Sequence, residues 1–400
     1  MKPGILRSED SVHGYLVYRQ RGGTNGRIPN VPKNTRSPLL RLNTVCPYYT
    51  MFPLEFPLRR LSKAQKDAWV LDPFCGRGTT VFAARLLGLG CVGIDSNPIA
   101  AAIAAAKLSN ASARAVINLA RSILEQTKAP NTVPEGEFWQ LCFHPQTLSE
   151  LCVLRERLLE QCVSSEEVAL RALLLGILHG PLQKGESTYL SNQMPRTYAT
   201  KPNAAVRFWK RQGLTTPPRV DVADAVAHRA MHTLAEIFPP ARGAVYFGDA
   251  RRTDSLLPRR RRFNWVITSP PYFGMRTYRP DQWLRNWFLG GETSVDYTQD
   301  GQLAHRADQF VEELSIVWRA VATRCMPGAR LIVRFGCLPS VPVDARDMLR
   351  TSLKLSNAKW RIYRWADAGS ASNGKRQSEQ FSSTTGTATR EVDVYARLEV

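Results

Sequence analysis

Short apolar runs and longer helical periodicities alternate along the first third of the chain. Residues 69–72 and 91–95 are predicted as buried strands, and residues 81–87 continue from the first of them as a helix. The pair Asn97-Pro98 opens an Ala-rich helix after the second strand, because proline is favoured in the first turn. Alternation of strand and helix in this order predicts a parallel sheet.

The middle of the chain follows a different pattern. Helical periodicity dominates residues 148–161, 166–178 and 221–237, and the polar, basic and aromatic stretch 183–220 between them is predicted as non-helical. Strand patterns then return near the C-terminal half, at residues 244–249, 265–269, 330–335 and 391–398. We therefore predict a doubly wound α/β fold with a mostly parallel sheet and a largely helical insertion.

These patterns divide the chain into four parts. Residues 1–44 form a basic, Gly/Pro-rich arm with little core of its own, and residues 45–128 form the first half of the sheet domain. Residues 129–240 are the helical and basic insertion, and residues 241–400 are the second half of the sheet domain. The insertion is the predicted target-recognition region if the partner is a nucleic acid.

Charge and composition narrow the class of partner. The 400 residues carry a formal charge of +20, which favours an anionic polymer, nucleic acid ahead of a membrane surface, over a merely solvated basic surface. The chain has no run of about 18 apolar residues and no apolar signal core at its start, so we expect no membrane contact and a cytoplasmic location. Its eight cysteines form no Cys-x-x-Cys pair, so we expect free thiols and no metal.

The first predicted strand runs into a glycine-rich turn. The stretch Asp72-Pro73-Phe74-Cys75-Gly76-Arg77-Gly78-Thr79-Thr80 exposes bare backbone at Gly76 and Gly78, but Val81 stands where a pyrophosphate site has its third glycine. Asp95, 17 residues beyond Gly78, ends the next strand and can accept hydrogen bonds from both hydroxyls of a ribose. A nucleoside without a polyphosphate, such as S-adenosylmethionine (AdoMet), matches this pattern. A tight strand–helix turn, with Asp95 as a helix cap, is the alternative.

A second motif ends a later strand. Ser269-Pro270-Pro271-Tyr272 follows the buried residues 264–268, and open α/β sheets bind ligands at the carboxyl ends of their strands. Two consecutive prolines stiffen the turn, which can therefore aim carbonyl oxygens at an amino group. Tyr272 offers a flat face on which a base can stack. Alone, the motif is equally consistent with a rigid loop and a half-buried tyrosine.

Taken together, these motifs resemble those of the amino-directed DNA methyltransferases. Residues 72–80 are similar to the AdoMet-binding motif of that family, and residues 268–272 resemble its catalytic motif in the form most associated with cytosine-N4 methylation. Four further segments resemble the family in a consistent order: the Phe-Pro segment at 49–58 that closes over the methionine end of the cofactor, the acidic motif at 92–98, Gly-Asp-Ala at 247–250, and the Pro-Gly turn at 326–330.

The resemblance implies a fold, a cofactor and a set of residues. The fold would be the mostly parallel, seven-stranded, Rossmann-like sheet of AdoMet-dependent methyltransferases. The implied catalytic residues are Ser269, Pro270, Pro271 and Tyr272. The implied cofactor-binding residues are Phe52, Pro53, Asp72, Phe74, Gly76, Gly78, Thr79, Thr80, Asp95, Ser96, Asn97 and Asp249. For Asp249, a turn-capping role is the alternative.

The chemistry expected at this site is methyl transfer to an exocyclic base amine, giving N4-methylcytosine. The amine lone pair is delocalised into the ring, so hydrogen-bond acceptors must draw the nitrogen toward a tetrahedral geometry. The Ser269 hydroxyl and the Pro270 carbonyl can be these acceptors, and Tyr272 can stack on the flipped base. Methylation at cytosine C5 would need a nucleophilic cysteine, usually in a Pro-Cys pair, which the chain lacks.

Basic and aromatic residues in the insertion are the predicted contacts with double-stranded DNA. They are Lys184, Arg196, Lys201, Arg207, Trp209, Lys210 and Arg211. A solvated loop packed on the helices of the insertion is the alternative. Arg259-Arg260-Arg261-Arg262 is a second candidate, either as a phosphate clamp or as a surface turn. A restriction-modification or defence nuclease is a candidate protein partner.

Two departures from the family leave the substrate open. Arg77 occupies a place where the family usually has a small residue, and the glycine motif precedes Ser-Pro-Pro-Tyr, the reverse of the order in many cytosine-N4 enzymes. Adenine-N6 methylation of DNA and methylation of an RNA base amine therefore remain as alternatives. A degenerate fold kept as a basic nucleic-acid-binding protein is the non-enzymatic alternative.

Overall fold

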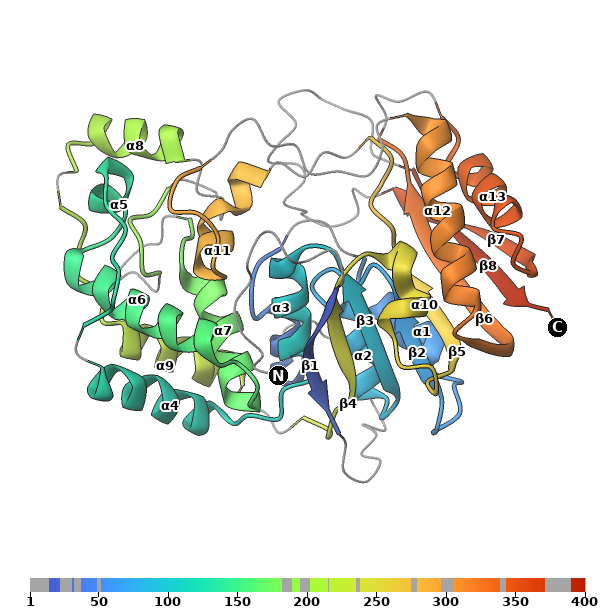
Figure 1. Ribbon diagram of the computed structural model, residues 1–400, viewed down its shortest axis with the longest axis horizontal. Coiled ribbons are helices and arrows are strands. Elements are labelled where there is room, and N and C mark those ends of the chain that lie inside the picture. The colour runs from blue at the N-terminus through green and yellow to red at the C-terminus, as the bar shows by residue number, and fades with distance from the viewer. Residues whose placement is uncertain are drawn as a thin grey trace.

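An eight-stranded mixed sheet forms the centre of the protein, which was analysed as a computed structural model (Figure 1). The structure describes residues 14–21, 31, 37–48, 52–127, 129–181, 189–194, 202–214, 216–234, 238–274, 279–295, 306–338, 343–370 and 390–399. The strand order is β1-β4-β3-β2-β5-β6-β8-β7. The strands are β1 (Tyr15–Gln20), β2 (Trp69–Asp72), β3 (Gly90–Asp95), β4 (Arg242–Phe247), β5 (Phe263–Thr268), β6 (Cys325–Gly336), β7 (Trp360–Ser370) and β8 (Arg390–Leu398).

Five parallel strands, β4, β3, β2, β5 and β6, make up the middle of the sheet. The chain moves outward from β2 through β3 to β4 on one side, and from β5 to β6 on the other. The order of strands therefore reverses between β2 and β5, which pair at Val70 with Trp265 and at Leu71 with Val266. Doubly wound sheets open a ligand crevice at the carboxyl ends of the strands at such a switch point.

Alternate residues of the central strands enter two separate hydrophobic cores, because neighbouring side chains of a strand point to opposite faces. Val70 and Cys91 belong to one core, and Leu71 and Val92 belong to the other. The first core includes side chains of α1 (Glu55–Leu61), α2 (Thr79–Leu86) and α3 (Pro98–Ala106). The second includes side chains of α12 (Ala307–Ala322) and α13 (Ala345–Leu355), with the short α10 (Thr253–Leu256) packed beside α12.

A helical layer extends the first core away from the sheet, on the left in Figure 1. Its helices are α4 (Ala113–Gln126), α5 (Glu137–Cys142), α6 (Pro145–Glu160), α7 (Ser165–Ile177), α8 (Pro202–Arg211), α9 (Val222–Thr233) and α11 (Trp283–Phe288). Helix α7 begins with a capping box, in which Ser164 and Glu167 each bond the other's backbone, and its buried face packs on α3. The α11 residue Trp287 lies 4.6 Å from Trp139 of α5, ring centroid to ring centroid, so the layer also takes in a segment from beyond residue 240.

Most predicted elements are confirmed, and the structure also contains helices that were not predicted, among them α4, α5, α12 and α13. Helix α8 lies within the stretch predicted as non-helical, and β7 was not predicted. Two stretches of the predicted arm belong to the fold: β1 pairs with β4, and a 3-10 helix, η1 (Pro38–Thr44), buries Leu40 and Leu42. The expectation of an arm with little core is therefore wrong for these stretches. Strand β1 is additional to the seven strands expected, and it covers the edge of β4.

Within the described ranges, no helix is long and apolar enough to cross a membrane. All eight cysteines fall in described segments and are free thiols. The described residues contain no group of three or more side chains placed to hold a metal ion.

Candidate active site

The two sequence motifs meet at the carboxyl ends of β2 and β5. Because these strands are neighbours, the last residue of β5 lies against the last residue of β2. The Thr268 hydroxyl donates to Asp72 Oδ1 over 2.7 Å, and both side chains are buried. This bond ties the glycine-rich turn to the start of Ser269-Pro270-Pro271-Tyr272, at the switch point where a ligand crevice is expected.

The two glycines of the turn have different surroundings. Both adopt positive φ angles, 49° at Gly76 and 81° at Gly78. A Cβ at Gly78 would lie 2.8 Å from the Ala104 Cα, so only glycine allows α3 to pack this closely. A Cβ at Gly76 would meet no atom within 4 Å. The backbone at Gly76 is therefore open to the approach of a ligand, as a nucleoside site requires.

Asp95 joins the glycine-rich turn to the end of β3. Its Oδ2 accepts from the Gly76 N–H and its Oδ1 from the Asn97 N–H, each over 2.8 Å. Burial raises the pKa of this carboxyl to about 6, against the opposing effect of the two N–H donors. Each oxygen keeps a second lone pair, so Asp95 can also accept from ribose hydroxyls. Beside it, Asn97 caps α3 by accepting from the Ile99 N–H over 2.9 Å, and Ser96 is exposed.

Three other predicted cofactor residues have buried side chains. Asp72 accepts from the Phe74 N–H over 3.2 Å as well as from Thr268, and burial raises its pKa to about 6. Thr80 is fully buried with its hydroxyl 3.4 Å from the Ile267 carbonyl oxygen, and Thr79 is buried at the first position of α2. The side chains of Asp72 and Thr80 therefore fix the ends of the strands, so contact with a cofactor would fall to the backbone around them.

The Phe-Pro segment enters α1 beside this turn. Phe52 is buried with its ring 5.2 Å from Phe56, and the Pro53 carbonyl accepts from the Phe56 N–H over 2.9 Å. Pro53 is exposed, and Phe74 of the glycine-rich turn is half-buried. Residues 49–51, which complete the segment, lie outside the described residues.

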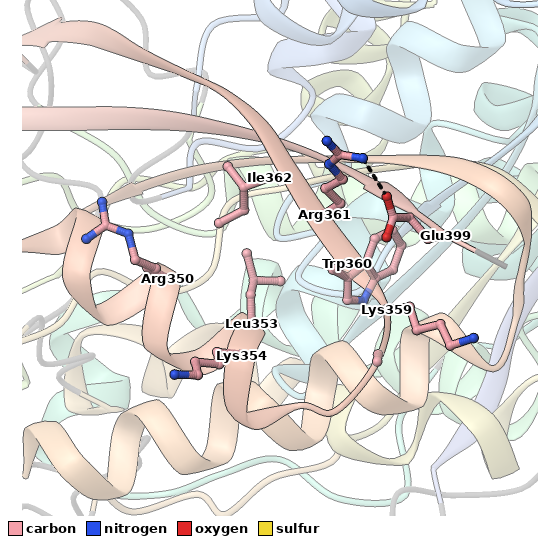
Figure 2. Close-up of a pocket in the computed structure, with 9 residues that line it drawn as sticks. Arg350, Leu353, Lys354, Lys359, Trp360, Arg361, Ile362 and Glu399 are labelled. Atoms are coloured by element: carbon pink, nitrogen blue, oxygen red, sulfur yellow. Dashed lines mark hydrogen bonds and ion pairs between the residues drawn. The ribbon is translucent and has the colours of Figure 1, made fainter.

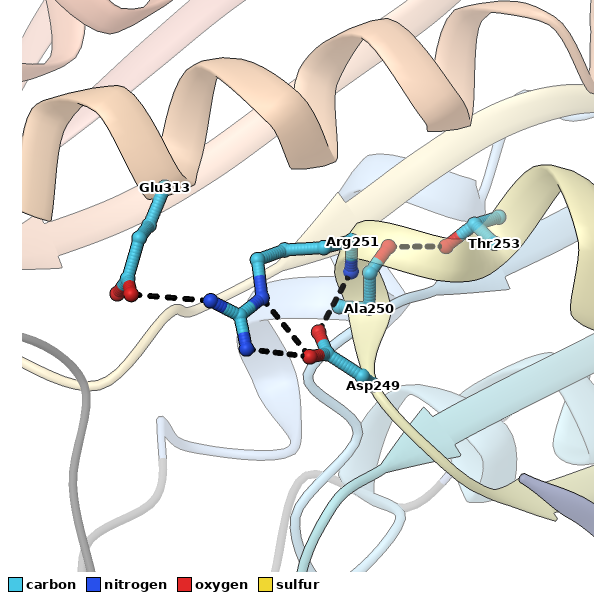
Figure 3. A network of polar contacts seen from close by, with 5 residues as sticks. All are labelled: Asp249, Ala250, Arg251, Thr253 and Glu313. Atoms are coloured by element: carbon cyan, nitrogen blue, oxygen red, sulfur yellow. Dashed lines mark hydrogen bonds and ion pairs between the residues drawn. The ribbon is translucent and has the colours of Figure 1, made fainter. Parts of the chain in front are cut away.

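Asp249 follows β4, next to the end of β3, but it is held in a local network (Figure 3). Its Oδ1 accepts from the Arg251 N–H over 2.8 Å, and its Oδ2 accepts from the Arg251 guanidinium over 2.6 and 2.8 Å. Arg251 also donates to Glu313 of α12 over 2.9 Å. The carboxylate thus caps the 3-10 turn η2 (Ala250–Arg252), and its predicted contact with the cofactor stays a prediction.

The Ser-Pro-Pro-Tyr motif is held at both ends. Thr268 fixes its start, and the Phe273 carbonyl accepts from the Leu338 N–H over 3.1 Å just beyond β6. Between these points Pro270 is buried, Pro271 is exposed and Ser269 is half-buried. Among the described residues, none forms a hydrogen bond with the Ser269 hydroxyl.

Tyr272 is oriented by residues that sequence reasoning did not select. Its hydroxyl donates to the buried Glu391 Oε1 over 2.5 Å, and its ring meets Phe335 edge-on at 6.2 Å between centroids. Arg334 of β6 donates to Asp393 over 2.8 and 3.0 Å, with a nitrogen 3.9 Å from Glu391. The acids at 391 and 393 alternate with valines in β8, and this pattern is the one sequence signal of buried charge.

The predicted nucleic-acid contacts fall into three groups. Lys184, Arg196 and Lys201 lie outside the described residues. Arg207, Lys210 and Arg211 are exposed on α8, where Lys210 forms an ion pair with Glu137. Trp209 is fully buried and its indole N–H donates to the Gln193 carbonyl over 3.1 Å. This burial corrects its predicted role in base contact, because the ring anchors α8 to the helical layer.

The arginine run at 259–262 precedes β5, and so lies at the amino ends of the parallel strands. Arg262 donates to the Arg259 carbonyl over 3.0 Å, and the Arg261 guanidinium lies 3.5 Å from the centre of the Trp69 ring. The run is therefore a surface turn at the amino ends of the parallel strands, whereas the Ser-Pro-Pro-Tyr motif lies at their carboxyl ends.

A shallow pocket of about 370 Å³ lies elsewhere, between α13 and the start of β7 (Figure 2). Arg350, Lys354, Lys359 and Arg361 give its lining a positive character, and Glu399 bonds Arg361 over 3.1 Å. It contains none of the predicted site residues.

Comparison with known proteins bears on the cofactor half of the site. Residues 25–106, which include the Phe-Pro segment, the glycine-rich turn and Asp95, match a family model described as DNA methylase. This match supports the amino-directed DNA methyltransferase family. The family points in turn to AdoMet as the cofactor. No curated protein sequence matches the chain.

Several solved structures match the chain at low similarity. The rRNA methyltransferase aviRa from Streptomyces viridochromogenes is 13% identical, with 93% of this chain and 96% of that chain covered and a TM-score of 0.36. TehB from Haemophilus influenzae is 7% identical, with 88% and 64% covered and a TM-score of 0.34. TrmN from Thermus thermophilus is 10% identical, with 92% and 50% covered and a TM-score of 0.31. Scores this low do not bear on the substrate.

Proposed function

We propose that this protein transfers a methyl group from AdoMet to the N4 amine of a cytosine flipped out of double-stranded DNA. The observation that carries the proposal is the meeting of the two motifs. Ser269-Pro270-Pro271-Tyr272 lies beside the glycine-rich turn at the switch point, joined to it by the 2.7 Å bond from Thr268 to Asp72. A cofactor on the turn and a base on Tyr272 would therefore share one crevice.

The residues of the turn suit a nucleoside cofactor. The open backbone at Gly76 allows close approach, and Asp95 has lone pairs left for the ribose hydroxyls. When bound, AdoMet supplies an electrophilic methyl group on a sulfonium sulfur. The protein itself supplies position and orientation, which are the main requirements for transfer between two bound reactants.

On the base side, the acceptors act on the amine before it attacks. The Ser269 hydroxyl and the Pro270 carbonyl would each accept a hydrogen bond from one N–H of the amine. The nitrogen would then become more tetrahedral, with its lone pair directed at the methyl group. Because Pro270 is buried and the loop is fixed at Thr268 and Phe273, these acceptors need little reorganisation. Stacking on Tyr272 would offset part of the few kcal/mol that base flipping costs.

DNA binding would rest on the charge of the protein and on the exposed cations of the insertion. The formal charge of +20 favours a polyanion, and Arg207 and Arg211 extend from α8 into solvent. Phosphate contacts of this kind position a duplex without reading its sequence.

The decisive experiment is incubation with AdoMet and DNA of mixed sequence, followed by mass spectrometry of the nucleosides. N4-methylcytosine is the expected product, and its rate of formation should fall about 10- to 100-fold in Ser269→Ala. Ser255→Ala, at an exposed serine of α10, is the matched control and should keep full activity.

Other products would revise the proposal in defined ways. N6-methyladenine would refute the choice of base and keep the class of enzyme. Methylation of RNA alone would refute DNA as the substrate. DNA binding without any methyl transfer, in wild type and variant alike, would support a non-enzymatic protein.

A further inference from the structure

Arg77 is a buried cation, and two of its guanidinium nitrogens are unsatisfied. It lies between the two glycines of the turn, just before α2, and only 6% of its surface is exposed. Its Nε and Nη2 atoms are fully buried and have no hydrogen-bond partner. Burial lowers its pKa to about 10, so the guanidinium still carries its charge at neutral pH. A buried charge without a partner is strongly unfavourable unless a ligand supplies the missing group.

A second buried arginine shows how this fold satisfies a structural one. Arg85, on α2 itself, is 2% exposed and donates from all three of its guanidinium nitrogens. Its acceptors are the carbonyls of Pro239, Lys107 and Ser109 and the side chain of Asn110, at 2.7–2.9 Å. Arg77 has no comparable set, so packing alone does not account for it.

The surroundings of Arg77 are positive. The fully buried Lys107 donates to the Leu42 carbonyl over 2.6 Å, and the nearby charge of Arg77 adds to the burial that lowers its pKa. Arg285 donates to the Pro47 carbonyl over 2.7 Å but has a buried Nη2 without a partner. The charges of Arg77, Lys107 and Arg285 each oppose the rise that burial causes in the pKa of the Cys46 thiol. Among the described residues, no carboxylate contacts Arg77. The cluster therefore has uncompensated positive charge and unsatisfied N–H donors that an anion could accept from.

The location identifies the anion. Arg77 shares its turn with Gly76, whose N–H reaches the proposed ribose acceptor Asp95. Arg77 also interacts electrostatically with Cys46, which precedes Phe52 and Pro53 in the chain. A nucleoside cofactor with its ribose at Asp95 would extend its amino-acid end along this turn. AdoMet has no phosphate, and its one anionic group is the carboxylate at that end.

We propose that Arg77 binds the methionine carboxylate of AdoMet and that this contact compensates its buried charge. The inference rests on the proposed function, because it takes AdoMet as the cofactor. A planar guanidinium can donate two parallel hydrogen bonds to a carboxylate, a geometry that lysine cannot reproduce. Arg77, which departs from the family pattern, would thus give this protein an additional contact with the cofactor.

The test is calorimetric binding of two nucleosides to the whole protein. One is S-adenosylhomocysteine, and the other is the same molecule without its carboxylate. The wild type should bind the first at least about tenfold more tightly than the second. Arg77→Met should lose that preference, with its affinity for the second nucleoside unchanged within about twofold. Arg77→Lys should keep part of the preference.

Thermal unfolding of the ligand-free protein separates a binding role from a structural one. Arg77→Met should unfold at the same or a higher temperature than the wild type, because it removes an uncompensated buried charge. Arg85→Met, the matched control, should unfold at a lower temperature, because it takes the guanidinium donors away from the carbonyls of the buried residues Pro239, Lys107 and Ser109.

Three results would overturn the inference. One is that the wild type and Arg77→Met prefer S-adenosylhomocysteine over the carboxylate-free nucleoside to the same degree. Another is that Arg77→Met binds both nucleosides more weakly than the wild type by the same factor. The third is a clear loss of stability in ligand-free Arg77→Met. A wild type that binds neither nucleoside would refute AdoMet as the cofactor, and the inference with it, whereas the first three results leave the proposed methyl transfer standing.

Discussion

Arg334 connects the surroundings of the Ser-Pro-Pro-Tyr motif to α1, the helix that follows the Phe-Pro segment. It is 8% exposed on β6, donates twice to Asp393 and lies near Glu391, which holds the Tyr272 hydroxyl. Its guanidinium also lies 4.0 Å from the centre of the Phe56 ring of α1. Arg334→Met keeps much of the apolar volume and removes the charge, so two buried carboxylates would lose their shared cation.

The expected loss of stability follows from the contacts that remain. Removing one partner of a buried ion pair costs about 3–5 kcal/mol. Asp393 would keep Arg60 at 3.3 Å and Glu391 would keep the Tyr272 hydroxyl, so we expect about 3 kcal/mol, the lower end of that range. With an unfolding entropy of about 2.1 cal/mol/K per residue, a loss of this size lowers the melting temperature by about 4 °C in a chain of 400 residues.

Calorimetry of Arg334→Met beside two companion variants tests this reasoning. Arg330→Met, at an exposed position of the same strand, should change the free energy of unfolding by no more than about 0.5 kcal/mol. The double variant Arg334→Met with Asp393→Asn should regain at least about 1 kcal/mol, because neutralising both partners leaves fewer unpaired charges. A single variant that melts within 1 °C of the wild type, or a double variant that regains nothing, would refute the argument.

Four further predictions concern the site and its partners. Burial raises the Asp95 pKa to about 6, so binding of S-adenosylhomocysteine should weaken about tenfold from pH 8 to pH 5, as the carboxylate gains a proton. The raised pKa has the opposite effect on the stability of the free protein: the group stabilises the fold below about pH 4, and that contribution disappears as the pH rises through 6. An affinity for S-adenosylhomocysteine that does not change with pH would contradict the binding prediction. Gly78→Ala should cost at least about 2 kcal/mol of stability, because its Cβ would lie 2.8 Å from a backbone atom of α3. Gly76→Ala, with open space around it, should cost about 1 kcal/mol and mainly weaken cofactor binding, and equal melting temperatures for the two variants would be inconsistent with this geometry. Tyr272→Phe should keep base flipping, measured by 2-aminopurine fluorescence in DNA, whereas Tyr272→Ala should lose most of it; identical signals would argue against stacking. Arg211→Gln should reduce the slope of log affinity for DNA against log salt by about 0.9, and an unchanged slope would show that Arg211 does not contact phosphate.

The sequence alone determined the frame of the site, because its signals are local. An apolar run of four residues that breaks into Gly76 and Gly78 can hardly be anything but a strand and a tight turn, and Asp95 ends the next strand by the same pattern. The prolines in Ser269-Pro270-Pro271-Tyr272 limit the backbone whatever surrounds them. These constraints act within a few residues, and the structure confirms the elements that they predict.

Tertiary structure decided the surroundings of the side chains. Tyr272 and Glu391 are 119 residues apart in the chain, so only the pairing of β6 with β8 could bring them together. The sequence suggested that Trp209 could stack on a base, but the fold buries it. Strand β1 forms by pairing with β4, which lies more than 200 residues away in the chain. The unsatisfied state of two guanidinium nitrogens of Arg77 is likewise set by everything that packs around it. A local pattern limits the backbone, but burial and partners depend on contacts between distant segments, and no local pattern encodes them.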